Sequence, residues 1–228
     1  MSRDRTRLGL GAALAGLLCL IAFGSDAPAR AAEETARFEL WIEITWSAER
    51  APLDFPEGAH TSRLIGATHN SRYVLFRDGD TASSGLELLA ENGRVSILEA
   101  ELAEAKRRRR VGTVIEGSGL ARVPDALTID FETSPDHPRL SFATMIAPSP
   151  DWFAGAADVA LMENGDWIEE ATLPLWAWDA GTDAGESYAA PNADSQPRES
   201  VRLLATPHVL TRDGLVPIGV ARLRRLTP

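Results

Sequence analysis

The amino-acid sequence predicts an all-β fold, an antiparallel β-sandwich with a short helical insertion at about residues 84–108. One observation is the alternation of apolar and polar residues over 38–46 (FELWIEITW), the period of a strand with one buried face. Another is the series of short apolar segments after Val111, separated by turn-forming residues. A third is Asn164-Gly165, a strong hairpin signal between apolar flanks. Many short strands joined by turns are typical of a sandwich.

The first part of the chain predicts one long strand and then loops. Phe38, Leu40, Ile42 and Ile44 fall on one face of the strand, which is therefore the face expected to be buried. A loop containing two Pro and a Gly follows over 52–58. Residues 73–76 (YVLF) form a short apolar run, and residues 77–80 (RDGD) are typical of a turn.

Two helices make up the insertion. Ser83 or Ser84 can cap the first, and Gly93 fits its end. The second is expected from about Val95 to Arg108 and ends in a basic run, residues 106–110 (KRRRR). We interpret this run as cations at a helix C-terminus, where they complement the helix dipole, in preference to a polybasic surface for nucleic acid or lipid.

From residue 111 onward the pattern predicts strands. The expected strands cover residues 112–115, 127–132, 139–146, 159–162, 167–175, 200–204 and 218–226. Residues 180–199 are rich in Gly, Ala, Asp, Ser and Pro and are expected to form a long loop. With 228 residues the chain is expected to hold one domain, or at most two.

The first 31 residues have the pattern of a secretory signal peptide rather than a membrane anchor. Three Arg near the start precede an apolar run over 8–23, which is short for a spanning helix, and Ala29-Arg30-Ala31 fits a cleavage site. Cys19 is the single cysteine and lies in that run behind Leu17-Leu18, which does not fit a lipoprotein site. We therefore expect an exported, periplasmic or secreted protein without disulfides.

The charge excludes some classes of partner. The formal net charge is −10, and it is more negative without residues 1–31, which hold four Arg and two acids. This balance argues against nucleic acid as a partner and against electrostatic docking on anionic lipid. It suits a protein that binds cations.

No catalytic motif is present in the sequence. The four His have no zinc-site spacing, and there is neither a G-x-S-x-G nucleophile elbow nor a P-loop. A serine triad stays open only because its members can be scattered along a sequence. We therefore predict a protein that is not an enzyme.

Acidic residues follow two of the predicted strands. Asp151 lies in residues 149–152 (SPDW), and Asp179 and Asp183 lie in residues 178–185 (WDAGTDAG). Carboxylates brought together repel each other unless a cation such as Ca²⁺ binds them. An EF-hand is excluded, because its third position would be Gly181 and its twelfth Ala190. From spacing alone, a metal site and simple turn-shaping roles are equally supported.

These same stretches resemble the spondin amino-terminal domain family. The resemblance rests on residues 147–155 (APSPDWFAG), Trp167, residues 178–185 and Pro191-Asn192, and extends upstream through residues 64–70 (LIGATHN) and 90–93 (AENG). It covers about residues 36–226, the expected spondin-like domain. The resemblance implies an eight-stranded antiparallel sandwich similar to calcium-dependent membrane-docking domains.

The resemblance also implies a metal site formed by Glu132, Asp151 and Asp179. Ca²⁺ is the expected ion, ahead of Mg²⁺ or Mn²⁺. Asp183 and main-chain carbonyls of residues 180–183 are further candidate ligands. Glu132 is assigned by its place 19 residues before Asp151 in an acid-rich stretch, without a strong local motif.

The function implied is a calcium-binding adhesion or recognition module. Its partner would be a protein or glycan, contacted through an acidic group on the metal. The alternatives are a hydrolase with paired carboxylates and a structural envelope protein stabilised by metal. The chain lacks the family's cysteines and thrombospondin-type repeats, so the roles of its animal members are not carried over.

Overall fold

The structure is a computed structural model that describes residues 35–51, 53–211 and 214–226. These residues belong to one compact unit that begins at Ala32. The predicted signal peptide, residues 1–31, lies outside the described residues. No helix within the described ranges is long and apolar enough to cross a membrane.

Strands dominate the unit, and two helices interrupt them. The helices are α1 (Ser84–Asn92) and α2 (Ser96–Arg107). The strands are β1 (Ala36–Ile44), β2 (His60–Thr61), β3 (Leu64–His69), β4 (Val111–Gly117), β5 (Asp125–Thr133), β6 (Arg139–Ala147), β7 (Trp152–Ala160), β8 (Met162–Glu163), β9 (Asp166–Trp167), β10 (Glu170–Asp179), β11 (Arg202–Leu203), β12 (Leu210–Thr211), β13 (Gly214–Leu215) and β14 (Gly219–Leu226).

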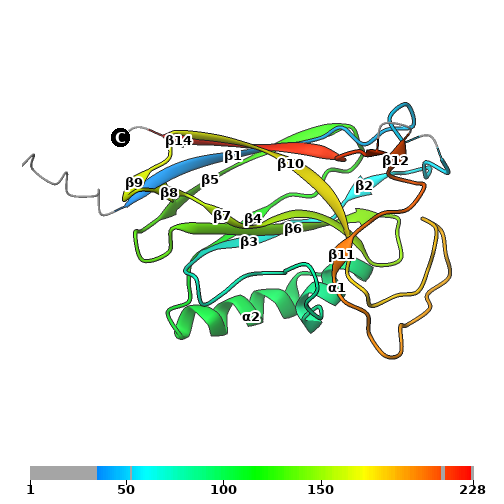
Figure 1. Cartoon of the computed structure of the whole chain (residues 1–228), viewed down its shortest axis with the longest axis horizontal. Helices are drawn as coiled ribbons and strands as arrows, with labels where there is room; N and C mark the ends of the chain where they lie inside the picture. The colour runs from blue at the N-terminus through cyan, green and yellow to red at the C-terminus, as the bar shows by residue number, and fades with distance from the viewer. Residues whose placement is uncertain (1–34, 52, 212–213, 227–228) are drawn as a thin grey trace, which may run out of the picture. The chain divides into compact units, whose positions relative to one another are not determined.

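Eight strands follow one another in the order β4-β3-β6-β7-β10-β14-β1-β5, all antiparallel. The long strand β10 passes from one layer to the other. Its first part, Glu170 to Leu175, pairs with β14, and its last part, Trp176 to Asp179, pairs with β7. The result is two layers, β10-β14-β1-β5 and β4-β3-β6-β7-β10, with the helices on the outer face of the second (Figure 1). The predicted sandwich is confirmed.

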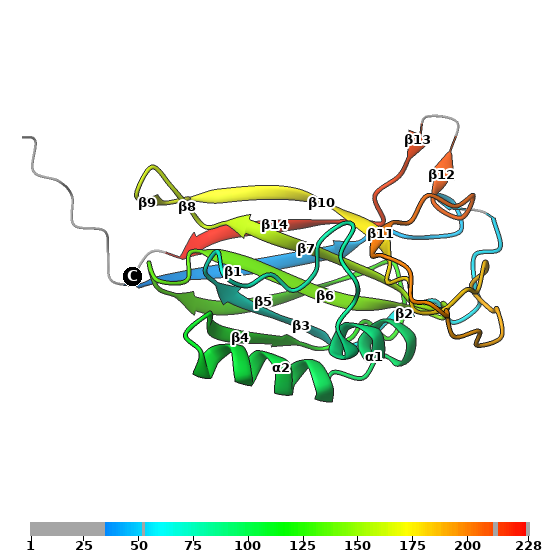
Figure 2. The ribbon, with the colours of Figure 1, turned by 60° about the horizontal axis from the view of Figure 1, so that its bottom comes forward.

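Two apolar clusters hold these layers together. The larger lies between the two sheet layers and includes the predicted buried face of β1, Phe38, Leu40, Ile42 and Ile44. The smaller lies between the second layer and the helices, where Phe153 and side chains of both helices pack together. Strand β6, in the middle of the second layer, is therefore buried on both faces. Figure 2 shows the two helices lying along this layer on the side away from β14 and β1.

The helical insertion forms as the sequence predicts. Ser83 caps α1, its hydroxyl accepting from the Leu86 N–H at 3.1 Å, and Gly93 ends it in the left-handed conformation with φ 65°. Lys106 and Arg107 lie in the last turn of α2. The basic run is thus partly a helix end, as expected.

Several boundaries differ from the sequence prediction. Strand β7 begins at Trp152, seven residues before the expected start. Within the expected 200–204 strand, only Arg202 and Leu203 form a strand, and Ser200 makes an isolated bridge to Thr81. The Asn164-Gly165 hairpin is confirmed, with both residues at positive φ between β8 and β9. The segment 180–199 contains no strand, as expected.

Candidate functional site

The register of two strands brings Asp151 and Asp179 together. Asp179 is the last residue of β10 and pairs with Trp152, the first residue of β7. Asp151 immediately precedes that residue, and its carbonyl accepts from the Ala180 N–H at 3.2 Å. In Figure 1 this is the end of β10 where β11 and the segment 180–199 gather. Two of the three predicted ligands are therefore neighbours.

Asp151 is fully buried, and its two oxygens have different surroundings. Oδ2 accepts from the backbone N–H groups of Thr182 at 2.7 Å and Asp183 at 3.1 Å, and from the Thr182 hydroxyl at 3.3 Å. Oδ1 is buried and has no hydrogen-bond partner among the described residues. Burial, together with the charge of Asp179, raises the pKa of Asp151 to about 6. A buried oxygen left without a partner is costly, so this site is suited to an additional ligand.

Asp179 is buried as well but already has a cationic neighbour. Its Oδ1 accepts from the Gly181 N–H at 2.8 Å, and its Oδ2 accepts from the Arg202 guanidinium at 2.8 Å. Burial raises the pKa of Asp179, and the Gly181 N–H and Arg202 oppose that rise. Arg202 also pairs with Glu199. Half of the Arg202 side chain is exposed, so it can leave Asp179 without crossing the core.

Asp183 has a structural role in the loop. Its Oδ1 accepts from the Gly185 N–H at 2.7 Å and its Oδ2 from the Ala193 N–H at 3.0 Å. Both oxygens therefore fix the shape of the segment that carries Thr182. This is the turn-shaping role that the sequence left open for the acids of this loop.

Glu132 is not part of this arrangement. It lies near the end of β5, which is level with the beginnings of β1 and β10, whereas Asp179 ends β10. The ten residues of β10 span roughly 30 Å. The Glu132 side chain is 67% exposed and lies 4.0 Å from the Arg37 guanidinium. The structure therefore corrects this assignment: Glu132 is too distant to share an ion with Asp151, because β5 belongs to the other layer and runs away from the site.

The structure adds residues that sequence reasoning missed. Arg202 and Glu199 border Asp179, and Glu91 of α1 lies near Thr182. These three residues reach the site only because of how β11 and α1 pack against it, and no local sequence pattern predicts that packing. Within the residues described, no group of three or more His, Cys, Asp or Glu is arranged to hold a metal ion.

A cavity of about 580 Å³ opens beside Asp179, and the neighbouring Asp151 lies behind its wall. Asp179, Arg202, Glu199, Trp152 and His208 are among the residues that line it. Trp152 is itself buried and packs on Tyr188 and His208, with ring centroids 5.1 and 5.4 Å away. The site is therefore a polar recess at the rim of the sandwich.

Comparison with known proteins places the whole region in one family. The Spondin_N family model matches residues 36–212. The chain is 33% identical over 174 residues to Spondin-2 of Rattus norvegicus, covering 75% of this chain and 53% of that protein. It is 30% identical over 210 residues to human Spondin-2, covering 88% and 63%, and 35% identical over 181 residues to human Spondin-1, covering 75% and 22%. The match thus spans between about half and two thirds of the Spondin-2 length and about a fifth of Spondin-1. The chain belongs to the Spondin_N family.

Proposed function

We propose that this chain is an exported, calcium-binding adhesion or recognition module without catalytic activity. The observation that carries the proposal is the buried Oδ1 of Asp151, which has no partner among the described residues and lies next to a second buried carboxylate, Asp179. Export is supported by the signal-peptide pattern of residues 1–31. The family membership supports a recognition module.

The residues around Asp151 fit a hard divalent cation. Ca²⁺ supplies a positive centre that takes six to eight oxygen ligands, and it relieves the repulsion between two carboxylates. Asp151 would contribute Oδ1, and Asp179 would contribute the oxygen that now accepts from Arg202. Main-chain carbonyls of residues 180–183 and water are the candidates for the remaining ligands. Glu132 is left out of the proposed site.

Arg202 would act as an internal substitute for the ion. When no cation is bound, its guanidinium partly neutralises Asp179. When a cation is bound, Arg202 is free to turn toward the cavity, where it can meet an acidic group of a partner protein or glycan. The segment 180–185 would keep its shape in both states through Asp183.

The hydrolase alternative has less support. Paired carboxylates that cleave glycosidic bonds must both reach the substrate. Asp151 has no exposed surface, and one of its oxygens is committed to two backbone N–H groups. A carboxylate in that position can hold an ion or shape a loop, but it cannot touch a polysaccharide.

Calorimetric titration of Ca²⁺ into residues 32–228 tests the proposal. Heat of binding is expected for the wild type and for Glu132→Gln, and it should be lost in Asp151→Asn. The partner chemistry is tested with immobilised hyaluronate, a carboxylate-bearing glycan, in excess Ca²⁺ and in chelator. Absence of Ca²⁺ binding by the wild type, or unchanged binding by Asp151→Asn, would contradict the proposed site.

A further inference from the structure

A second polar pocket lies at the other end of the second sheet layer. Its cavity of about 600 Å³ is lined by Asn70, Arg72, Lys106, Arg109, Val111, Gly112, Asp136 and His137. The strand register places this pocket beside the start of β6 and the end of β7. Asp151 lies at the opposite end of β7, immediately before its first residue. The pocket is therefore separate from the acidic site.

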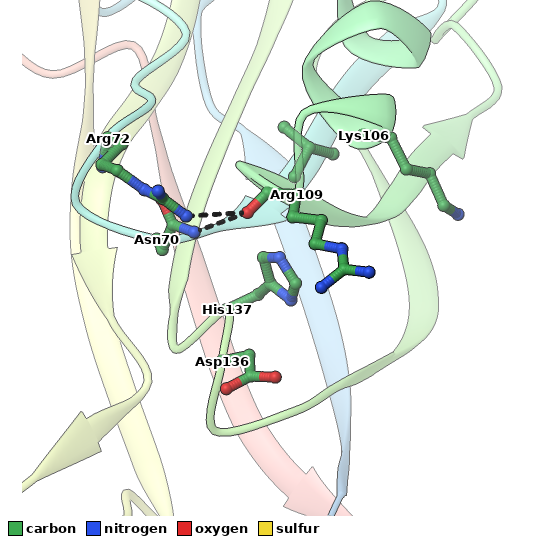
Figure 3. A pocket seen from close by; sticks show the side chains of 8 residues that line it. Asn70, Arg72, Lys106, Arg109, Asp136 and His137 are labelled. Carbon is green, nitrogen blue, oxygen red and sulfur yellow. Dashed lines mark hydrogen bonds between the residues drawn. The ribbon is translucent and has the colours of Figure 1, made fainter.

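The pocket gathers basic side chains that have no acidic partner. Within the described ranges, Arg72, Lys106 and Arg109 form no ion pair, whereas Arg107 and Arg108 of the same basic run both pair with Glu104. Figure 3 shows Arg72 and Arg109 on either side of His137, with Lys106 beyond Arg109 at the rim and pointing away from the ring. Unpaired guanidinium groups of this kind are the donors that suit phosphate or sulfate.

His137 provides an independent sign of a ligand. Its Nε2 is buried and has no hydrogen-bond partner among the described residues, while its Nδ1 lies 3.4 Å from the Ser134 hydroxyl. Gly112 makes room for the ring, because a Cβ at that position would lie 2.9 Å from His137 Cγ. A buried ring nitrogen without a partner, in the wall of a basic pocket, is suited to an oxygen atom of a bound anion.

The frame of the pocket is fixed before any ligand binds. The Asn70 side-chain amide donates to the Arg109 carbonyl at 2.9 Å, and its carbonyl accepts from the Arg72 N–H at 3.0 Å (Figure 3 shows the first of these bonds). The Arg72 guanidinium also reaches the Arg109 carbonyl, at 3.4 Å. Asn70 thus ties the end of β3 to the end of α2, and binding would require little ordering of the backbone.

Asp136 narrows the class of ligand. Its carboxylate lies below His137 in Figure 3, at the edge of the pocket that it helps to line, and can only accept hydrogen bonds while ionised. A bare anion gains nothing from it, whereas a sugar hydroxyl can donate to it. The cavity volume is in the range of small-molecule sites and exceeds what one inorganic phosphate fills.

We propose that this pocket binds a sugar that carries a phosphate or sulfate group. Arg72, Arg109 and His137 Nε2 bind the oxyanion, Lys106 adds charge at the rim, and Asp136 accepts from a sugar hydroxyl. The basic run at the end of α2 then has two functions. Arg107 and Arg108 end the helix, while Lys106 and Arg109 serve the pocket.

Titrations with glucose 6-phosphate and with inorganic phosphate, followed by amide chemical shifts at low ionic strength, test this proposal. The wild type is expected to bind glucose 6-phosphate more tightly than inorganic phosphate. Arg109→Gln should weaken both by about tenfold to a hundredfold, the loss expected for a charge-assisted hydrogen bond. Arg107→Gln is the matched control, because it also removes one positive charge but from a side chain that pairs with Glu104 and does not line the pocket. It should change the affinity for either probe by less than about threefold.

Asp136→Asn distinguishes recognition of the sugar hydroxyl from recognition of the phosphate group. It should weaken glucose 6-phosphate binding while leaving inorganic phosphate unchanged or tighter, since a repelling charge is removed. Equal affinity of the two probes would overturn the sugar part of the proposal. No binding of either probe, or equal losses in Arg107→Gln and Arg109→Gln, would overturn the site itself. The thermal transition of each variant establishes that it is folded.

Discussion

Replacement of Asp151 by Asn separates the loop-shaping role that its carboxylate has in the structure from the ion-binding role that we propose for it. An Asn side chain keeps one oxygen, which can still accept from the Thr182 and Asp183 N–H groups. It removes the buried charge that Asp179 repels. In chelator, Asp151→Asn should therefore be as stable as the wild type to within about 1 kcal/mol, the usual net value of one hydrogen bond.

Replacement by Ala removes both roles at once. Two buried backbone N–H groups then lose their acceptor, at a cost of about 1–3 kcal/mol each. For a domain of this size, 1 kcal/mol shifts Tm by about 2–4 °C, so Asp151→Ala should melt at least about 4 °C below the wild type in chelator. The difference between the Asn and Ala variants thus measures the structural role alone.

The change in stability on adding Ca²⁺ then tests the proposed ion-binding role of Asp151. At a free Ca²⁺ concentration of 100 times Kd, one bound ion stabilises the fold by about 2.7 kcal/mol, which raises Tm by about 5–11 °C. The assay is thermal unfolding by circular dichroism in excess Ca²⁺ and in chelator. The wild type and Glu132→Gln should show the rise, and both Asp151 variants should not. A full Ca²⁺ shift in Asp151→Asn would refute the reasoning.

Three further predictions concern the scaffold. Burial lowers the pKa of His69, so the unfolded chain takes up a proton at a higher pH than the folded protein, and stability falls as pH drops from about 6.5 toward the folded pKa. His69→Gln should therefore reduce the loss of unfolding free energy between pH 7 and 5, measured by urea unfolding. An unchanged dependence of stability on pH in this variant would contradict the role of His69. Ser83→Ala should cost about 1 kcal/mol in urea unfolding, because the Leu86 N–H loses its cap, and a neutral effect would contradict the cap's role. Gly155→Ala should cost about 1–3 kcal/mol, since its Cβ would lie 2.3 Å from the Phe142 carbonyl oxygen, and a wild-type urea midpoint would show that the strands can part freely.

The sequence predicts an element best where one face of that element is polar. Strand β1 alternates because one of its faces packs in the core and the other does not, and the alternation is visible in the sequence. Strand β7 was missed between Trp152 and Ala156 because the sheet core covers one of its faces and the helices cover the other. Burial on both faces removes the alternation on which the prediction depends.

The same limit applies to the candidate site. The pattern of residues places Asp151 and Asp179 each at the end of an apolar strand, and the resemblance of the surrounding stretches to the family implies that they pair. Whether Glu132 lies near Asp151 depends on which strand β5 pairs with. Nothing in the residues around Glu132 indicates that β5 pairs with β1, in the layer opposite to β7. The ion pair of Arg202 with Asp179 was missed for a similar reason, since β11 is only two residues long.

Asp151 and Asp179 are proposed to hold one divalent cation between them. The most direct measurement is an anomalous-difference map from crystals of residues 32–228 grown with Ca²⁺. We expect one peak at about 2.3–2.6 Å from Asp151 Oδ1 and from an oxygen of Asp179, with the Arg202 guanidinium moved away. A map with no peak at Asp151, and with Arg202 still bound to Asp179, would contradict the account.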